Sequence, residues 1–183
     1  MIVFYTASYH GKDHYQKWYD LVLDTLKHQP ISLISPELGN YQNVLTKSAR
    51  LKAGSANQIH YAAIKKGIEK SDAVVIEMSH QDFQLGWEAS LAVQAKKPVL
   101  CLSIHEDFTA KISHPYFHAA KYSEVTIDDL IEGFIRKSAK HQLRERFNFF
   151  LSPSQLEYLK KYGQKTHQKP SALLRSLIDE KRF

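Results

Sequence analysis

Short continuous apolar runs alternate with longer amphipathic segments over the first 140 residues. The runs are typical of strands buried on both faces of a sheet, and the longer segments carry apolar residues near helical spacing. The predicted strands are residues 2–6, 31–34, 73–76, 98–102 and, at an edge of the sheet, 120–125. The predicted helices are residues 13–28, 57–70, 86–95 and 126–140. Because strands alternate with helices, we expect a parallel α/β domain over residues 1–140.

Residues 71–102 form a βαβ unit within this pattern. A polar loop follows the first strand of the unit, and Gly86, Trp87 and Glu88 begin the helix that leads to the second strand. Ligands of such parallel sheets bind at the carboxyl ends of the strands. Asp82 and Glu88 are at that end, so we expect the chemistry of the protein there.

Two other polar connections follow predicted strands. Residues 7–11 form a small polar turn before the first helix, and the free N–H groups of a helix start can bind an anion or a hydroxyl. Residues 35–56 are long and irregular, although residues 41–51 favour a helix. A connection of this kind is either a lid or binding loop or a disordered excursion, and both interpretations stay open.

The character of the chain changes after residue 140. Residues 147–151 predict a short strand, Ser152 and Pro153 begin a helix over 155–165, and Pro170 opens a second helix. This 145–183 module is too small to bury enough apolar surface by itself. We therefore expect it to dock on the first domain or to pair with a copy of itself.

The composition is that of a soluble globular protein, with a net charge of +6. That charge suits an anionic partner or an ordinary solvated basic surface. No apolar run approaches the roughly 20 residues of a membrane span, and the N-terminus lacks the basic start of a signal peptide. The lone Cys101 lies in an apolar strand and should be a reduced, inert thiol. We expect a cytoplasmic protein with no membrane partner.

Residues 103–118 contain His105, His114 and His118 together with two carboxylates, which raises the question of a metal site. His114 and His118 are four residues apart, but Pro115 between them prevents a shared helical face. We therefore expect no metal and no other cofactor.

Residues 1–140 resemble the nucleoside 2-deoxyribosyltransferase superfamily, which includes the 2'-deoxynucleoside 5'-phosphate N-hydrolases. The resemblance is carried by the segments 3–11, 71–75, 82–88 and 96–100. It implies a five-stranded, flavodoxin-like parallel sheet in a homodimer or higher homo-oligomer, with sites near subunit boundaries. It also implies a nucleoside or nucleotide as the small-molecule partner.

The same resemblance assigns roles to individual residues. Glu88 stands at the position of the catalytic nucleophile, where a carboxylate attacks the anomeric carbon of the sugar and forms a covalent intermediate. At the start of a helix, the dipole would help to keep Glu88 ionised. Asp82 stands where nucleoside-type members hold the sugar 5'-hydroxyl, and its charge would repel a phosphate dianion. The substrate-binding positions that the resemblance implies are Phe4, Ser8, His10, Gly11, Asp82 and Gly86.

One departure from the family concerns proton transfer. The family carries an aspartate at the position of Ile64, where it handles the proton of the departing base. The neighbours of Ile64 include no carboxylate, although His60 and Tyr61 lie one turn earlier and could face the same side. A pocket that binds its ligand without catalysis is therefore the main alternative to an enzyme.

The 145–183 module resembles a ribbon-helix-helix module. In that family two strands pair across a dimer, with alternate residues facing the core and the DNA. The resemblance implies core positions at Phe147, Phe149 and Leu151 and outward positions at Arg146, Asn148 and Phe150. Of the outward residues, Arg146 and Asn148 are the candidates for reading DNA bases. The sequence thus supports a nucleoside-processing enzyme, a nucleoside-sensing transcriptional regulator that binds DNA through this module, or a pure interaction protein.

Overall fold

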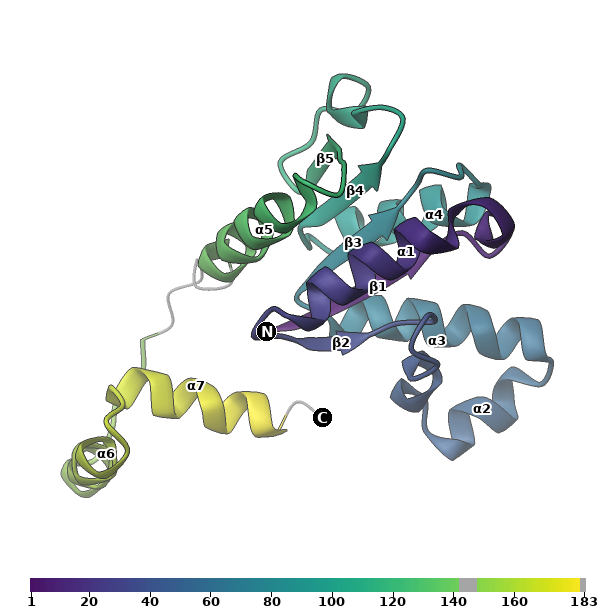
Figure 1. Cartoon of the computed structure of the whole chain (residues 1–183). Coiled ribbons are helices and arrows are strands. Elements are labelled where there is room, and N and C mark those ends of the chain that lie inside the picture. Colours follow the sequence, from purple (N-terminus) through teal and green to yellow (C-terminus); the bar gives the residue numbers. More distant parts are fainter. Residues whose placement is uncertain (142–147, 182–183) are drawn as a thin grey trace. The chain divides into compact units, whose positions relative to one another are not determined.

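The computed structural model describes residues 1–141 and 148–181. The chain divides into two compact units, Met1–Arg144 and Glu145–Phe183, and each unit is considered by itself. The first unit is an α/β sheet domain, and the second consists of two helices in its described part (Figure 1). The predicted division of the chain into residues 1–140 and 145–183 is close to this boundary.

The first unit is built on one parallel sheet of five strands. The strands are β1 Ile2–Ala7, β2 Ser32–Ile34, β3 Ala73–Glu77, β4 Val99–Ser103 and β5 Phe117–Lys121. Their order is β2-β1-β3-β4-β5, and every pair is parallel. This is the flavodoxin-like arrangement, so the predicted fold class is confirmed. The order reverses between β1 and β3, where ligands of such sheets bind.

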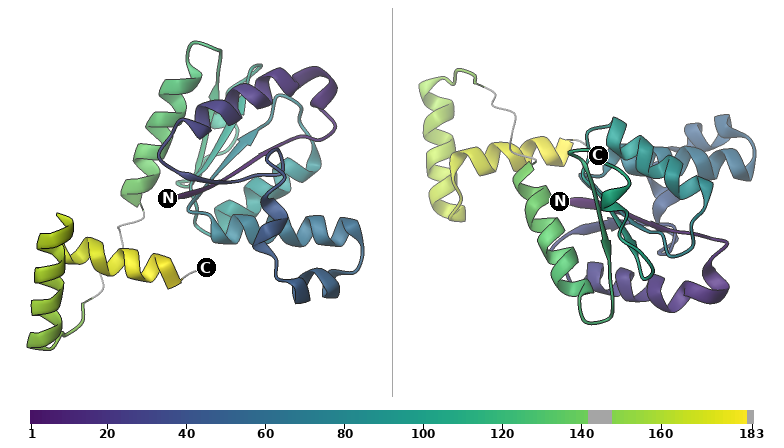
Figure 2. Two further views of the ribbon diagram at one scale, coloured as in Figure 1. Left: turned by 60° about the horizontal axis from the view of Figure 1, so that its bottom comes forward. Right: turned by 90° about the horizontal axis from the view of Figure 1, so that it is seen from above.

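Helices cover both faces of the sheet. They are α1 Lys12–Lys27, α2 Lys47–Ala53, α3 Ala56–Lys70, α4 Phe83–Gln94 and α5 Ile127–His141, with the 3-10 helices η1 Tyr41–Val44 and η2 Phe108–Ala110. Helices α1 and α5 pack on one face, and α3 and α4 on the other (Figures 1 and 2). Alternate residues of β1 follow this division, because successive side chains of a strand point to opposite faces. Val3 and Tyr5 join the core under α1 and α5, and Phe4 joins the core under α3 and α4.

Helix α3 approaches the sheet closely at Gly67. A Cβ atom at this position would lie 2.6 Å from the Phe4 ring, which is well inside van der Waals contact. Gly67 thus sets the distance between α3 and β1.

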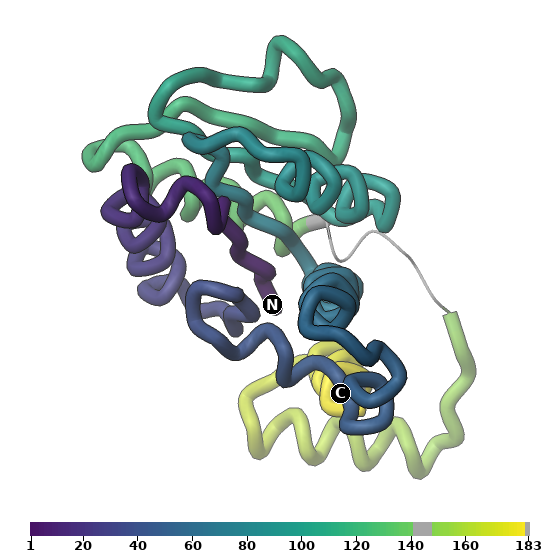
Figure 3. Tube along the Cα trace, turned by 90° about the vertical axis from the view of Figure 1, so that its right-hand side faces the viewer, coloured from purple at the N-terminus to yellow at the C-terminus, as the bar shows by residue number. Residues whose placement is uncertain are grey.

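The segment between β2 and α3 is folded. It contains η1 and α2, which both contact α3 (Figures 1 and 3). Thr46 caps α2 by accepting a hydrogen bond from the Ala49 N–H at 3.1 Å. Ser55 caps α3 in a capping box with Gln58. Residues 35–56 are thus folded, which contradicts the disordered excursion.

The predicted edge strand at 120–125 is wrong in position, because β5 is Phe117–Lys121. As an edge strand it has a neighbour on one side only, and Phe117 is its one buried residue. The sequence therefore contains no apolar run to mark it. Tyr122, just beyond the strand, is buried and donates a hydrogen bond to Glu77 at 3.0 Å. Its aromatic side chain extends the apolar pattern past the end of β5, so the predicted strand was too far along the chain.

Helix α4 begins at Phe83, three residues before the predicted start at Gly86. Asp82 is the N-cap, and its Oδ1 atom accepts a hydrogen bond from the Leu85 N–H at 2.9 Å. This capping satisfies one of the free donors of the first turn. As a result Glu88 lies in the second turn of the helix and not at its start.

The second unit consists of α6 Pro153–Thr166 and α7 Pro170–Lys181. Ser152 and Gln155 form a capping box at the start of α6, as the sequence predicts for a Ser-Pro helix start. Leu159 and Leu173 are buried, whereas several apolar side chains of the unit are exposed. Residues 148–151 are not in a strand. A ribbon strand needs a second copy to pair with, and the predicted residues Arg146 and Phe147 lie outside the described part of the chain.

Within residues 1–141 and 148–181, no helix is long and apolar enough to cross a membrane. Cys101 is buried in β4, and burial raises the pKa of its thiol to about 12. The thiol therefore stays protonated at neutral pH.

Candidate functional site

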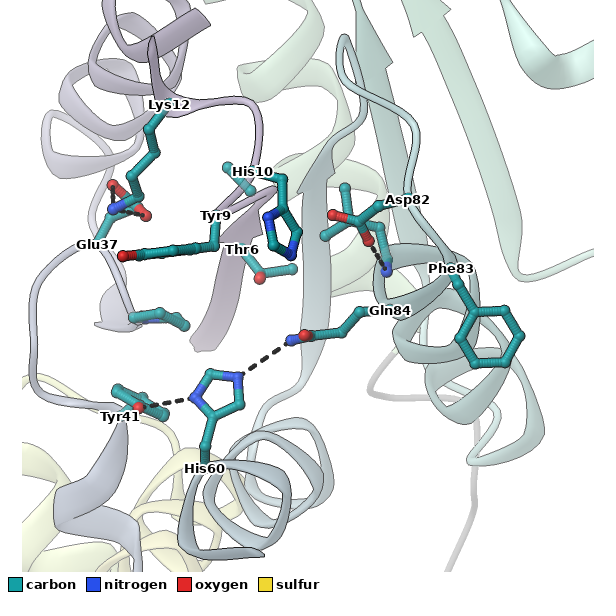
Figure 4. Close-up of a pocket in the computed structure, with 13 residues that line it drawn as sticks. Thr6, Tyr9, His10, Lys12, Glu37, Tyr41, His60, Asp82, Phe83 and Gln84 are labelled. Carbon is teal, nitrogen blue, oxygen red and sulfur yellow. Dashed lines mark hydrogen bonds and ion pairs between the residues drawn. The ribbon is translucent and has the colours of Figure 1, made fainter. Parts of the chain in front are cut away.

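A cavity of about 680 Å³ opens at the carboxyl end of the sheet, beside the reversal between β1 and β3. Its walls come from the end of β1, the turn into α1, the segment after β2, helix α3 and the start of α4 (Figure 4). The lining residues are Thr6, Ala7, Tyr9, His10, Lys12, Pro36, Glu37, Tyr41, His60, Asp82, Phe83, Gln84 and Leu85. Of the predicted site residues, His10 and Asp82 line this cavity.

Asp82 is held in place by both of its carboxylate oxygens. Oδ1 caps α4 at the Leu85 N–H, and Oδ2 accepts a hydrogen bond from the hydroxyl of the buried Ser8. Two donors on different elements, the Leu85 N–H and the Ser8 hydroxyl, leave the carboxylate little rotational freedom. Asp82 thus presents a fixed negative charge at the cavity wall, and Ser8 supports it from behind.

Glu88 lies beneath the cavity and is fully buried. Its Oε1 atom accepts a hydrogen bond from the Gln84 amide at 2.7 Å, and among the described residues no group bonds its Oε2 atom with good geometry. Burial raises the pKa of Glu88 to about 7, and hydrogen bonding to Gln84 and Thr6 only partly opposes that effect. The expectation that the helix dipole keeps Glu88 ionised is wrong, because the dipole acts within the first turn and Glu88 is in the second.

Gln84 connects Glu88 to a histidine across the cavity. Its Nε2 atom lies 2.7 Å from Glu88 Oε1 and 3.1 Å from His60 Nε2, so the two amide hydrogens can serve the two acceptors. On the other side of the ring, His60 Nδ1 lies 2.9 Å from the Tyr41 hydroxyl (Figure 4). Burial lowers the pKa of His60. The result is a continuous row of hydrogen bonds from Glu88 to Tyr41.

A second cavity of about 390 Å³ adjoins the first, between α3 and α4. It is lined by Asn57, His60, Tyr61, Ile64, Phe83, Gln84 and Trp87. The Tyr61 and Trp87 rings stack with centroids 4.8 Å apart, and the Phe83 side chain is 90% exposed. His60, Phe83 and Gln84 belong to both cavities and form the boundary between them. The second cavity is a largely aromatic surface suited to a flat ring.

On the opposite wall, Lys12 forms an ion pair with Glu37 at 2.9 Å. Gln16 also donates to Glu37, at 3.3 Å. This pair connects the start of α1 to the segment after β2, so it fixes one side of the cavity. Because the lysine charge is already compensated, it does not leave a free cation for a phosphate.

The remaining predicted site residues lie outside the two cavities. Phe4 is buried in the core against Gly67 and does not reach the ligand space. Gly11 caps α1 and packs against Tyr19 and His80, where a Cβ atom would lie 2.2 Å from the Tyr19 hydroxyl. Gly86 is exposed on α4 with open space around it. The structure thus brings together Ser8, His10, Asp82 and Glu88. Asn148 belongs to the second unit.

The polar residues of the site that were not predicted from the sequence include Thr6, Lys12, Glu37, Tyr41 and Gln84. The spacing of Gln84 and Glu88, four apart on one helix, is a signal that could have shown their contact. Thr6 could have been found from the end of the first strand. Tyr41 and Glu37 come from the irregular segment after β2, where no spacing rule applies.

A second buried carboxyl, Glu77, lies at the end of β3 and outside both cavities. It accepts hydrogen bonds from the Ser79 hydroxyl and, at 3.2 and 3.0 Å, from the Ser79 N–H and the Tyr122 hydroxyl. Burial raises the pKa of Glu77 to about 7. Ser79 follows β3 and Tyr122 follows β5, so Glu77 joins the segments after these two strands through hydrogen bonds.

Within the described residues, no group of three or more histidine, cysteine, aspartate or glutamate side chains is placed to hold a metal ion. The chain matches no model of a known protein family, and no curated protein matches it either. The geometry of the site consequently carries the functional argument.

Proposed function

We propose that the protein cleaves or transfers the N-glycosidic bond of a nucleoside or deoxynucleoside, with Glu88 as the nucleophile. The observation that carries the proposal is the pair of acids on α4: Asp82 is fixed at the cavity wall, and Glu88 lies buried beneath the same cavity, six residues later. The resemblance of residues 1–140 to the nucleoside 2-deoxyribosyltransferase superfamily supports the same reaction.

In this reaction a Glu88 oxygen attacks the anomeric carbon of the sugar. The bond between that carbon and the base breaks, its electron pair leaves with the base, and a covalent glycosyl-enzyme forms. Water or a second base then attacks the same carbon and releases Glu88 as a carboxylate. Asp82 accepts a hydrogen bond from the sugar 5'-hydroxyl, and its fixed charge favours a nucleoside over a nucleotide.

The buried state of Glu88 has two consequences for turnover. Gln84 has to leave its position above Glu88 before a sugar can reach the carboxylate, since Gln84 lines the cavity and Glu88 does not. The nucleophile must also be ionised. With a pKa of about 7, only about half of the Glu88 carboxyls are ionised at neutral pH. The fraction of Glu88 that can act as the nucleophile therefore grows as the pH rises through 7.

The test is incubation with a panel of deoxynucleosides, with the free base followed by chromatography. Wild type should release base from at least one substrate, and the isosteric E88Q variant should not. An E132Q variant, which removes an exposed carboxyl on α5, is the matched control and should keep wild-type activity. If wild type and E88Q are equally inactive on every substrate, the proposal is wrong.

A second candidate is a nucleoside-sensing regulator that binds DNA through the second unit. The observation in its favour is the apolar surface that this unit leaves exposed: Phe150, Leu177 and Ile178 are among its exposed side chains, and Leu159 and Leu173 are the buried ones. Two helices with so much exposed apolar surface call for pairing, as in a ribbon-helix-helix dimer. The absence of a carboxylate at Ile64 also suits a pocket that binds without turnover.

This candidate is tested by binding to genomic DNA fragments over a range of salt concentrations. Retention that falls with salt, and that is lost in the R146A/N148A double variant, would support DNA readout. A chain that ends at residue 144 should be monomeric while the full chain is dimeric. A dimer that survives the deletion would exclude the second unit as the dimerisation element.

A further inference from the structure

We propose that His60 is a catalytic residue that gives a proton to the departing base and takes one back in the second step. The inference rests on the proposed N-glycosidic reaction and deepens it. It assigns the proton transfer to a group on α3, one turn before Ile64, that Gln84 links to Glu88 by hydrogen bonds.

The position of Gln84 shows how His60 and Glu88 are placed relative to one another. One amide nitrogen lies within hydrogen-bond distance of both, 2.7 Å from Glu88 Oε1 and 3.1 Å from His60 Nε2. When Gln84 moves aside, the reacting bond of a substrate can occupy the space between these groups. The anomeric carbon then faces Glu88, and the base nitrogen faces His60.

The second cavity explains why the base lies on the side of His60. His60 lines both cavities, and beyond it the stacked Tyr61 and Trp87 rings and the exposed Phe83 offer flat apolar surface. Asp82 lines only the first cavity, so it would contact the sugar of the nucleoside there. A nucleoside that spans the two cavities thus has its glycosidic bond at their shared boundary.

A single proton, carried by His60, is sufficient for both steps of the reaction. In the reactive form Glu88 is ionised and His60 is protonated. As Glu88 forms its bond to the anomeric carbon, the bond to the base breaks, and the proton on His60 Nε2 passes to the base nitrogen. The neutral His60 then accepts a proton from the attacking water or acceptor base, while the bond to Glu88 breaks. Both groups return to their starting charges.

The contacts of His60 suit a group that changes protonation. The Tyr41 hydroxyl can accept a hydrogen bond from Nδ1–H or donate one to a bare Nδ1, so it supports every state of the ring. Gln42 donates to the same hydroxyl at 3.0 Å and holds it in place. The other titratable side chains that face the two cavities are Tyr9, His10, Lys12, Glu37, Tyr61 and Asp82. Lys12 and Glu37 are paired with each other, and Asp82 is held by Ser8.

The test compares two substrates that differ in their need for a proton. The neutral base of 2'-deoxyguanosine leaves well only when it is protonated, whereas 7-methyl-2'-deoxyguanosine already carries a positive charge and releases a neutral base. H60Q keeps an amide near the Nε2 position but cannot transfer a proton. We expect H60Q to lower kcat/KM for 2'-deoxyguanosine by about 10²–10⁴-fold and to change the 7-methyl substrate less than about tenfold. H105Q, at an exposed histidine outside the cavities, should match wild type on both.

Each result decides the inference. A loss in H60Q that is equal for both substrates, or no loss for either, overturns the role of His60. So does a wild-type protein that cleaves only the 7-methyl substrate, although the proposed glycosidic reaction then stands. If wild type cleaves neither, the proposed function itself fails, and His60 with it. The pH profile is a second readout: the fall in rate at high pH should occur with 2'-deoxyguanosine and be absent with the 7-methyl substrate, because only the first needs protonated His60.

Discussion

The burial of Glu88 predicts that E88Q stabilises the protein, and increasingly so as the pH rises. The carboxyl has a pKa of about 7 in the folded chain against an ordinary value of 4.5. Below pH 4.5 it is protonated in both states and costs nothing. Between pH 4.5 and 7 the unfolded chain loses this proton while the folded chain keeps it, so stability falls as the pH rises. Above pH 7 the cost is constant.

The size of the effect follows from the pKa difference. At 1.36 kcal/mol per pKa unit, the full cost of keeping Glu88 folded and buried is about 3 kcal/mol. Most of that cost appears between pH 5 and pH 8. We therefore expect the difference in unfolding free energy between E88Q and wild type to grow by about 2 kcal/mol over this interval. The buried amide of E88Q adds a cost of its own, but that cost does not depend on pH.

The assay is urea unfolding of wild type, E88Q and E132Q at pH 5, 6, 7 and 8, with the free energies compared at each pH. The buried Glu77 titrates in wild type and E88Q alike, so its contribution cancels in the difference. E132Q removes an exposed carboxyl, and its difference from wild type should stay constant. A difference between E88Q and wild type that is also constant would show that Glu88 is solvated in the folded protein, and the argument from burial would be refuted.

Three further predictions concern the surroundings of the site. G67A should be about 1–3 kcal/mol less stable than G133A in urea unfolding, because both gain helix propensity but only the first forces a methyl group against the Phe4 ring; equal stabilities would contradict the close approach of α3. Native Cys101 should resist iodoacetamide at pH 8 and react once urea unfolds the chain; rapid labelling of the native protein, read by mass spectrometry, would contradict its burial. S8A should lower the unfolding free energy by about 2 kcal/mol through loss of the hydrogen bond to Asp82, and an unchanged value would show that this bond is not formed.

The sheet was predictable from the sequence wherever its strands have neighbours on both sides. The residues of β3 and β4 are buried without exception, and a strand buried on both faces reads as a continuous apolar run. The predicted position of β5 was wrong because this strand pairs with β4 alone and has one buried residue. Its sequence therefore lacks the continuous apolar run that marks β3 and β4.

The start of α4 was misplaced for a different reason. The residues Ser79 to Gln84 read as a polar loop, yet an aspartate followed by an apolar pattern is also a helix N-cap. That error carried over to Glu88, whose ionisation was attributed to a helix start that lies five residues earlier. Burial, which decides its pKa, cannot be read from one helix alone, because Thr6 and Gln84 cover the carboxyl from two different elements.

The wall of the cavity formed by Pro36, Glu37 and Tyr41 comes from the segment between β2 and α3, outside the sheet. Of these three side chains, none belongs to the buried core. Substitutions, insertions or a transplanted segment can therefore alter this wall at little cost to folding, whereas changes to the wall on α4 disturb the capping of that helix. The fold thus separates the part that evolution or design can vary from the part that has to stay constant. A new ligand preference would be sought first by diversifying Pro36 and Glu37, with Tyr41 kept as the partner of His60.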